Sequence, residues 1–335
     1  KKIESRYSQN QKKKVVRKKV NPVIIHNVYQ CMKDCCSLSE HHRLGLIRDR
    51  KIPLERIEQD YFTCPTNWRQ KDTIIAGIKE KYPAYTDEIL MNIPGFFYDK
   101  KRGKLSFTGH KGLGILIRNS DSRIVAIQIR KDTIQEGDSR YIWFSSSFAT
   151  YNPDEYNGGN GCGSPKDVCY PQMLKKHTLC ITEGRFKSEK LTESGNISIS
   201  VQGVTSWHGI EETIKHMKGI HNVFIFFDAD ILGKHVLFMQ SEKMIRKIQD
   251  EFPGLYIRYA FWSKKNGKGI DDCIIAGNIS KVKYYEAKRA AEICNDAYTH
   301  ALGEYHVANL RELKQERAKE FEDYLQILTE SMLGL

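Results

Sequence analysis

The chain has 335 residues, and its 53 lysines and arginines against 41 aspartates and glutamates give a net charge of +12. A hydrophobic content of 40% and a charged content of 28% are typical of an ordinary soluble protein with room for two or three subdomains. These values exclude a fibrous or wholly disordered chain. No stretch approaches the roughly 18 apolar residues of a membrane span, so we expect no contact with a membrane.

Residues 1–20 are predicted to form a basic flexible tail. They hold nine lysines or arginines and one glutamate, so they carry +8 of the charge and the rest of the chain only +4. Such a block could bind phosphates nonspecifically, and a solvated tail without a specific role is an equal alternative. No apolar segment follows it, so no secretory signal is expected. Because the sequence begins with lysine, we expect a fragment of a longer protein.

The nine cysteines, an odd number in a chain without a secretory signal, indicate a reducing, cytoplasmic setting. Four of them lie near two histidines in the first 64 residues, which raises zinc as an alternative. The paired Cys-x₂-Cys spacing of structural zinc sites is missing, so zinc is not expected. The residues concerned are Cys31, Cys35, Cys36, His41, His42 and Cys64.

Residues 21–100 are predicted to be a mostly helical region. Ser37 and Glu40 have the spacing of a capping box that opens a helix. Further helices are predicted over 67–82 and 85–92. A basic run in this region is expected to be a solvated face, with nucleic-acid contact as the alternative; it comprises Arg43, Arg48, Arg50 and Lys51.

Residues 101–177 change to the pattern of a basic antiparallel-strand subdomain. Segments 113–118, 123–130 and 140–146 alternate or run apolar as strands do, with turn residues between the first two. Residues 149–177 are rich in glycine and asparagine and predict a long loop. We expect Arg118 and Arg130 at neighbouring strand ends, as a cationic wall or as a solvent-facing sheet side.

Two apolar runs in residues 178–279 end abruptly in carboxylates. Thr178–Thr182 is followed by Glu183, and Val223–Phe227 is followed by Asp228 and Asp230. The runs predict buried strands, and the helix-like segment after each predicts a parallel α/β sheet. Ligands of such sheets bind at the carboxyl ends of the strands.

The three carboxylates should therefore meet at one rim of the sheet. Crowded there, they would repel each other unless a cation lay between them, and hard oxygen ligands suit Mg²⁺ or Mn²⁺. Taken singly, each motif has a bland alternative, since a Glu-Gly turn and a chance Asp-x-Asp are common. Their order and their position at strand ends favour a site.

Residues 280–335 are predicted to be helical throughout, with a break near Gly303. Apolar residues recur there at helical spacing, which is typical of packing against an α/β body. A helix that binds a partner is the alternative. The stripe comprises Leu310, Leu313, Phe321, Leu325 and Leu328.

Glu183-Gly184 followed by Asp228-Ala229-Asp230 resembles the Toprim fold of bacterial replicative primases, topoisomerases and some nucleases. In that family these carboxylates hold the metal used for phosphoryl transfer, which implies the same role for Glu183, Asp228 and Asp230. A third acidic site is matched by Asp271 and Asp272, implied as further metal ligands.

Two residues depart from the Toprim pattern. Primases often carry an acid four residues after the glutamate, where this chain has Lys187. They also often carry an acid at the place of Gly269. These departures imply fewer or more weakly held metal ions.

The strands before this core resemble the subdomain that precedes Toprim in bacterial primases. Ile117-Arg118-Asn119, Gln128-Ile129-Arg130 and the strand from Arg140 take the places of its three motifs. The likeness is closer still to Toprim-like proteins of plasmids and integrative elements, which share the later Gly163-Ser164-Pro165. The resemblance implies that template or nucleotide is bound by Arg118, Arg130 and Arg140. Lys187 falls about one turn into the helix after Glu183, where it could reach a phosphate at the helix N-terminus or equally be a solvated residue. Lys268 belongs to a basic loop before Asp271, which puts cations beside the carboxylates, where phosphates would need them.

The predicted fold is α/β: a Toprim core with a Rossmann-like parallel sheet, preceded by a small mixed α/β subdomain and followed by C-terminal helices. The predicted function is primer synthesis by a nucleotidyltransferase that uses nucleoside triphosphates, Mg²⁺ or Mn²⁺ and a single-stranded DNA template. Replication of a mobile element is the expected setting, with a replicative helicase as a candidate partner. The alternatives are a Toprim nuclease and a catalytically inactive nucleic-acid-binding module, which Lys187 and Gly269 favour.

Overall fold

A computed structural model describes residues 20–175 and 177–335, so nearly all of the basic tail predicted for residues 1–20 lies outside the described residues. The described chain divides into two compact units. Unit 1 contains residues up to 42, 58–116 and 123–165, and unit 2 contains residues 43–57, 117–122 and 166–335. Within the described residues, no helix is both long and apolar enough to cross a bilayer.

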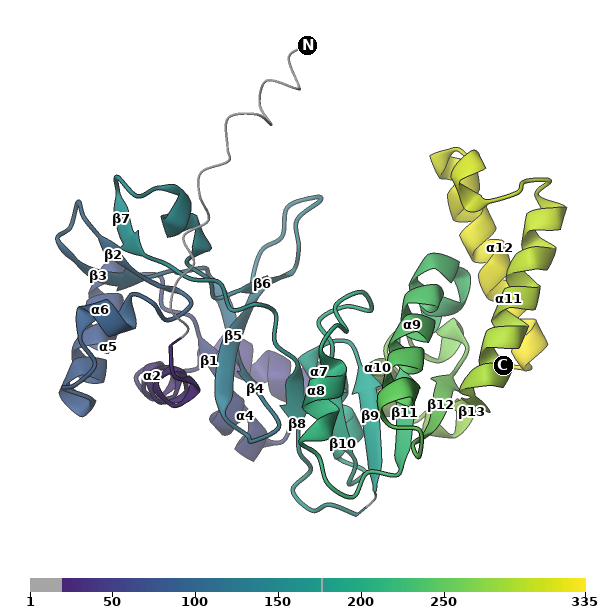
Figure 1. Ribbon diagram of the computed structural model, residues 1–335, viewed down its shortest axis with the longest axis horizontal. Coiled ribbons are helices and arrows are strands. Elements are labelled where there is room, and N and C mark those ends of the chain that lie inside the picture. The colour runs from purple at the N-terminus through teal and green to yellow at the C-terminus, as the bar shows by residue number, and fades with distance from the viewer. Residues whose placement is uncertain (1–19, 176) are drawn as a thin grey trace, which may run out of the picture. The chain divides into compact units, whose positions relative to one another are not determined.

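Unit 1 is built on two antiparallel sheets (Figure 1). The first has the strand order β1-β4-β5-β6 and the second the order β3-β2-β7. The meander expected from the alternating segments is confirmed as β4, β5 and β6. The strands are β1 (Tyr61–Thr63), β2 (Phe96–Asp99), β3 (Lys104–Phe107), β4 (Gly112–Arg118, its last two residues in unit 2), β5 (Ile124–Lys131), β6 (Tyr141–Trp143) and β7 (Tyr156–Gly158).

Unit 1 also contains the helices α2 (Pro22–Asp34), α5 (Trp68–Lys81) and α6 (Asp87–Leu90) and the 3-10 helix η2 (Ser147–Tyr151). Asparagine side chains start the first two, because Asn21 and Asn67 accept a hydrogen bond from the second helical N–H at 2.9 and 2.8 Å. The apolar faces of these helices cover the sheets over one buried cluster. Among its members are Val28, Tyr29, Ile74, Ile78, Phe96, Phe107, Ile127 and Phe144.

The predicted capping box at Ser37 is wrong. The helix α3 (Glu40–Leu44) begins at Glu40, and Ser39 Oγ accepts the hydrogen bond from the N–H of His42 at 3.3 Å. The chain continues as a π-helical turn, η1 (Gly45–Asp49), and as α4 (Leu54–Asp60). The N–H groups of the first helical turn have no partner within the helix, and Ser39, three residues before His42, satisfies one of them. The capping residue is therefore Ser39 and not Ser37.

Unit 2 is organised around a six-stranded sheet in the order β13-β12-β11-β9-β10-β8. The four central strands run parallel, and the two edge strands pair antiparallel with their neighbours. The parallel α/β sheet expected from the two apolar runs is confirmed. The strands are β8 (Asp167–Cys169), β9 (Thr178–Thr182), β10 (Ile197–Ser200), β11 (Asn222–Phe226), β12 (Tyr256–Phe261) and β13 (Lys283–Glu286).

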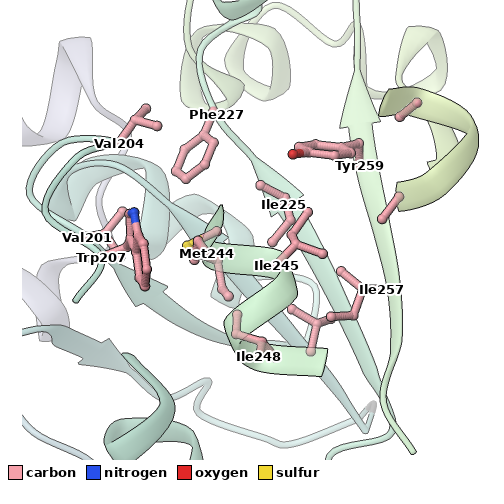
Figure 2. Packing of buried hydrophobic residues seen from close by; sticks show 14 of the residues in the cluster. Val201, Val204, Trp207, Ile225, Phe227, Met244, Ile245, Ile248, Ile257 and Tyr259 are labelled. Atoms are coloured by element: carbon pink, nitrogen blue, oxygen red, sulfur yellow. The ribbon is translucent and has the colours of Figure 1, made fainter. Parts of the chain in front are cut away.

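Helix α9 (His235–Glu251) covers one face of this sheet. Figure 2 shows its Met244, Ile245 and Ile248 against Ile225 of β11 and Ile257 of β12. Each such side chain, when fully buried, stabilises the fold by roughly 1.5–3 kcal/mol. The other helices and short helical turns of unit 2 are α7 (Arg185–Thr192), α8 (Ile210–Lys215), η3 (Ala229–Gly233), η4 (Lys264–Asn266), α10 (Ile270–Ile275) and η5 (Ile279–Lys281).

Helices α11 (Ala287–Glu304) and α12 (Gln315–Leu333), with η6 (Leu310–Glu312) between them, close the chain. They pack through Ala297 and Ala301 of α11 and Phe321 and Leu325 of α12. The expectation that residues 280–335 are helical throughout is wrong for β13, which adds an edge strand beside β12. The loop expected over 149–177 likewise contains β7 and the edge strand β8.

Candidate active site: an acidic rim with its own cations

Two neighbouring strand ends bring the first carboxylates together. β9 and β11 are paired in parallel with Thr182 opposite Phe226, and Thr182 Oγ1 donates a hydrogen bond to the carbonyl of Phe226 at 2.7 Å. Glu183 and Asp228 therefore leave the sheet side by side. Gly184 follows with φ +87°, a backbone conformation that favours glycine, and turns the chain into α7.

The loop before α10 closes the same edge. The N–H of Ala229, in the Asp-x-Asp segment, donates to the carbonyl of Lys268 at 2.9 Å. Asp271 then lies at the start of α10, and the N–H of Gly269 donates to Asp272 Oδ2 at 3.1 Å. We call the five carboxylates of this edge the acidic rim: Glu183, Asp228, Asp230, Asp271 and Asp272.

A residue of the last helix holds the Asp-x-Asp turn in place. The side-chain amide of Gln326, on α12, donates to the carbonyl of Ala229 at 3.0 Å and accepts from the N–H of Gly233 at 2.8 Å. Both ends of η3, which contains Asp230, are thereby fixed. Sequence reasoning missed Gln326, because nothing local marks a residue that acts 97 positions away.

Cations of the chain itself reach most of the rim. Lys187 Nζ contacts Asp228 Oδ1, and Lys234 Nζ lies 2.8 Å from Asp230 Oδ2. The exposed Lys268 lies 3.9 Å from Asp228 and 3.6 Å from Asp230. These lysines pair with Asp228 and Asp230. Arg50, described next, pairs with Asp271 and Asp272, so four of the five carboxylates have a cationic partner.

Arg50 belongs to the basic run that was expected to be a solvated face, and that expectation is wrong for it. Its guanidinium lies 2.9 Å from Asp271 Oδ2 and 3.9 Å from Asp272 Oδ1, and it stacks over the ring of Phe186 at 5.0 Å. Asp271 and Asp272 as metal ligands stay a prediction, but Arg50 already neutralises Asp271.

The pKa shifts record how tightly these charges are coupled. Burial raises the pKa of Glu183; the charge of Lys187 opposes the rise, and the charges of Asp228 and Asp230 add to it. Burial lowers the pKa of Lys187, but the charge and hydrogen bond of Asp228, with the charges of Glu183 and Asp271, raise it overall. The charges of Glu183, Asp228 and Lys187 therefore act directly on one another.

The donor chemistry of the rim fits a divalent ion, since carboxylate oxygens are the ligands that Mg²⁺ and Mn²⁺ prefer. Its side-chain positions fit less well. Within residues 20–175 and 177–335, no three histidine, cysteine or acidic side chains are grouped so as to hold a metal. Glu183 is the rim carboxylate without an ion pair among the described residues. The rim therefore fits one ion, on Glu183, Asp228 and Asp230, provided that Lys187 moves off Asp228.

The arginines predicted to bind nucleic acid do not form one wall. Gly112, which starts β4, lies against the carbonyl of Arg130, whereas Arg118 ends the same strand. Arg130 therefore lies beside the first residue of β4, and Arg118 is its last residue. The expectation that the two arginines lie at neighbouring strand ends is wrong. Arg118 donates to the carbonyl of Ser122 at 2.9 Å. The structure does bring Arg130 and Arg140 to the same end of β5 and β6, where the N–H of Lys131 donates to the carbonyl of Arg140 at 3.0 Å.

Sequence reasoning also missed a basic aromatic surface in unit 1. The side chain of Trp68, at the start of α5, is 53% exposed. Three cations lie over its ring at 5.2, 5.4 and 5.5 Å from the centroid. The hairpin of β2 and β3 delivers two of them, and Asp72 holds that pair in place. We call this the Trp68 surface: Trp68, Arg69, Arg102 and Lys104.

Comparisons with known proteins agree with the architecture. The model of a domain of unknown function, DUF3854, matches residues 170–280, and no curated protein matches the chain. Among solved structures, the zinc-binding and RNA polymerase domains of the *Aquifex aeolicus* primase match at 12% identity and a TM-score of 0.53, over 99% of this chain and 79% of that one.

Two further primase structures match at the same level. A DNA primase domain from *Pseudomonas aeruginosa* has 12% identity and a TM-score of 0.53, over 91% of this chain and 99% of that one. The RNA polymerase domain of *Mycobacterium tuberculosis* primase, in complex with a double-stranded DNA oligomer with a 6-nucleotide overhang, has 12% identity and a TM-score of 0.54, over 92% and 97%. The chain thus has the fold of a primase catalytic domain, as the sequence resemblance predicted.

Proposed function

We propose that the protein is a primase-type nucleotidyltransferase that builds short primers on single-stranded DNA, with the acidic rim as its reacting centre. The observation that carries the proposal is the meeting of Glu183, Asp228 and Asp230 at the ends of β9 and β11, on a fold shared with primase catalytic domains. Replication of a mobile element and a helicase partner are part of the proposal on the sequence resemblance alone.

The chain's own residues would divide the work of phosphoryl transfer, which depends mainly on positioning and on neutralising charge. Lys234 and the exposed Lys268 stand beside the carboxylates, where they could hold the phosphates of an incoming nucleotide. Mg²⁺ or Mn²⁺ bound by Glu183, Asp228 and Asp230 would supply further neutralisation of the triphosphate and acidify an attacking hydroxyl.

The Trp68 surface supports single-stranded DNA as the template. Bases stack on exposed aromatic rings without regard to sequence, and arginines and lysines around the ring attract the phosphate backbone. The four residues carry a charge of +3, and the neighbouring Asp72 offsets one unit. In the same unit, Arg130 and Arg140 are proposed as further template or nucleotide ligands.

The test is a priming assay on single-stranded DNA with labelled ribonucleotides and with Mg²⁺ and Mn²⁺ in turn. Glu183→Gln keeps the size of the side chain but removes the charge, so we expect primer synthesis to fall on the order of 100-fold or more. Glu251→Gln, at an exposed carboxylate on α9 paired with Lys247, is the matched control and should retain wild-type activity. Equal activity of Glu183→Gln and wild type would refute the assignment.

One observation favours a second function, a nucleic-acid-binding module without catalysis. Lys187, Lys234, Lys268 and Arg50 bring four positive charges to the five carboxylates of the rim. A rim that is nearly neutral on its own has little need of a metal. Under this alternative the wild-type protein binds single-stranded DNA but makes no primer with either metal.

A further inference from the structure

Lys187 lies inside the acidic rim. Its ammonium contacts Asp228, and the charges of Glu183 and Asp271 also act on it. The two side chains in contact are only 18% and 15% exposed. A solvated lysine at the edge of the site would be far more open to water, so this cation is part of the carboxylate cluster.

The position of Lys187 in its helix supports this assignment. Lys187 is the third residue of α7, which begins at Arg185. The helix dipole disfavours a cation in the first turn. The surrounding carboxylates must therefore supply the attraction that holds the ammonium there, as a metal ion would be held.

Gly269 is the structural counterpart of Lys187. Its φ of −93° is open to any residue, so the backbone does not require glycine. A Cβ built at this position would lie 2.7 Å from Lys187 Cε, 2.4 Å from Asp271 Oδ1 and 3.6 Å from Asp228 Oδ1. The space that a side chain at position 269 would take is thus filled by the lysine and the carboxylate it helps to neutralise.

We propose that Lys187 and Gly269 form a coupled pair, in which the ammonium of Lys187 takes the place of a divalent cation between Asp228 and Asp271. The rim then accepts at most one divalent ion, on the side of Glu183, and binds it in competition with Lys187. The importance of this pair for catalysis rests on the proposed function. The inference itself concerns only how the rim binds a metal ion. It accounts for both departures from the acidic pattern by one physical cause.

The test measures Mn²⁺ binding to the full chain by isothermal titration calorimetry, without DNA or nucleotide. Wild type should bind no more than one ion. Lys187→Met removes the competing charge, so its affinity for Mn²⁺ should rise at least about tenfold. Lys187→Arg keeps a positive charge and should not bind more tightly than wild type.

An acid introduced at position 269 should add a metal ligand only when Lys187 has also been replaced. Lys187→Met combined with Gly269→Asp should bind a second ion, whereas Gly269→Asp alone should gain nothing, because Lys187 still fills the space. Lys247→Met is the control for charge, since Lys247 is paired with Glu251 on exposed α9. Circular dichroism of each variant checks that the fold is retained.

Two results would overturn the inference: two ions bound by wild type, or a Lys187→Met affinity equal to that of Lys247→Met. The first needs no variant, so it decides the matter even where a substitution perturbs the fold. Failure of the proposed function has a different signature. In that case no primer is made, while the pattern of Mn²⁺ binding across the variants stands.

Discussion

Two of the three cations of helix α7, Arg185 and Lys187, lie in different surroundings. Arg185 contacts Asp167 Oδ1 at 3.1 Å and Glu189 Oε1 at 2.8 Å, and none of the three side chains is more than 2% exposed. Lys187 contacts Asp228 at the rim, where the two side chains are 18% and 15% exposed. One cluster is sealed from water, and the other is partly accessible to it.

The difference in exposure to water distinguishes ion pairs that stabilise the fold from ion pairs that are available for function. The carboxylates of Asp167 and Glu189 are already satisfied by a guanidinium that water cannot replace, so they fasten α7 to the edge strand β8. The carboxylate of Asp228 is partly accessible to water, and on the proposal above it exchanges its lysine for a divalent ion. Ion pairing alone therefore does not disqualify a carboxylate from a functional role; access to solvent is what distinguishes the two.

The largest expected effect comes from breaking the sealed cluster. Arg185→Met removes the cation shared by two buried carboxylates, of which Glu189 keeps only Arg56 at 3.8 Å, and we expect the free energy of unfolding to fall by about 3–5 kcal/mol. Lys187→Met is the matched substitution on the same helix and should cost less, since its ion pair is partly accessible to water. Urea denaturation of both variants measures the contrast. Equal losses would show that the two clusters are alike and remove the basis of the comparison.

The next effect concerns where DNA binds. The cations of the rim are engaged by carboxylates, whereas the three cations of the Trp68 surface have one acidic partner, Asp72, among the described residues. Trp68→Ala should therefore weaken binding of a single-stranded oligonucleotide by about 1–3 kcal/mol, the usual contribution of one stacked base. Fluorescence anisotropy at fixed salt measures it.

A control for Trp68→Ala is available in the same unit. Tyr151 is 69% exposed and, within the described residues, has no cation over its ring. Tyr151→Ala should leave the affinity for DNA unchanged. Should both variants bind DNA as wild type does, the Trp68 surface is not a template site and the charge of the molecule acts elsewhere.

Patterns along the sequence predicted the parts of this site that are local. β9 and β11 were evident because each is an apolar run that ends in acids, and parallel strands necessarily bring such ends together. β13 was missed because Lys283–Glu286 is a short edge strand whose formation depends on its partner β12. Arg50 was misplaced because its partner, Asp271, is 221 positions away and leaves no local mark.

Lys187 shows a different limit of sequence reasoning. Its distance from Glu183 was visible in the sequence, and it was predicted to approach a phosphate. What the sequence could not show is that Gly269 vacates space for it, since that requires the loop before α10 to fold back against α7.

The smallest expected effect concerns Glu330 and tests whether neutral hydrogen-bond donors can stabilise a partly buried carboxylate without an ion pair. Glu330, on α12, accepts hydrogen bonds from Ser263 Oγ at 2.6 Å and from the N–H of Lys264 at 3.0 Å. Burial raises its pKa, but these bonds, with one from Gln326 and the charge of Lys265, lower the pKa overall. Its partners are mostly neutral donors, so it stands between the sealed cluster and the rim.

A carboxyl group with a lowered pKa in the folded state stabilises the protein above its unfolded pKa, about 4.3, and loses that contribution as the pH falls through the folded value. Glu330→Gln should therefore cost about 1 kcal/mol at pH 7 after solvent screening, and the difference from wild type should shrink between pH 5 and pH 3, roughly. Urea denaturation across this pH range measures the gap. A gap that stays constant to the acid end would mean that the charge of Glu330 contributes nothing, and that only its shape holds the loop after β12.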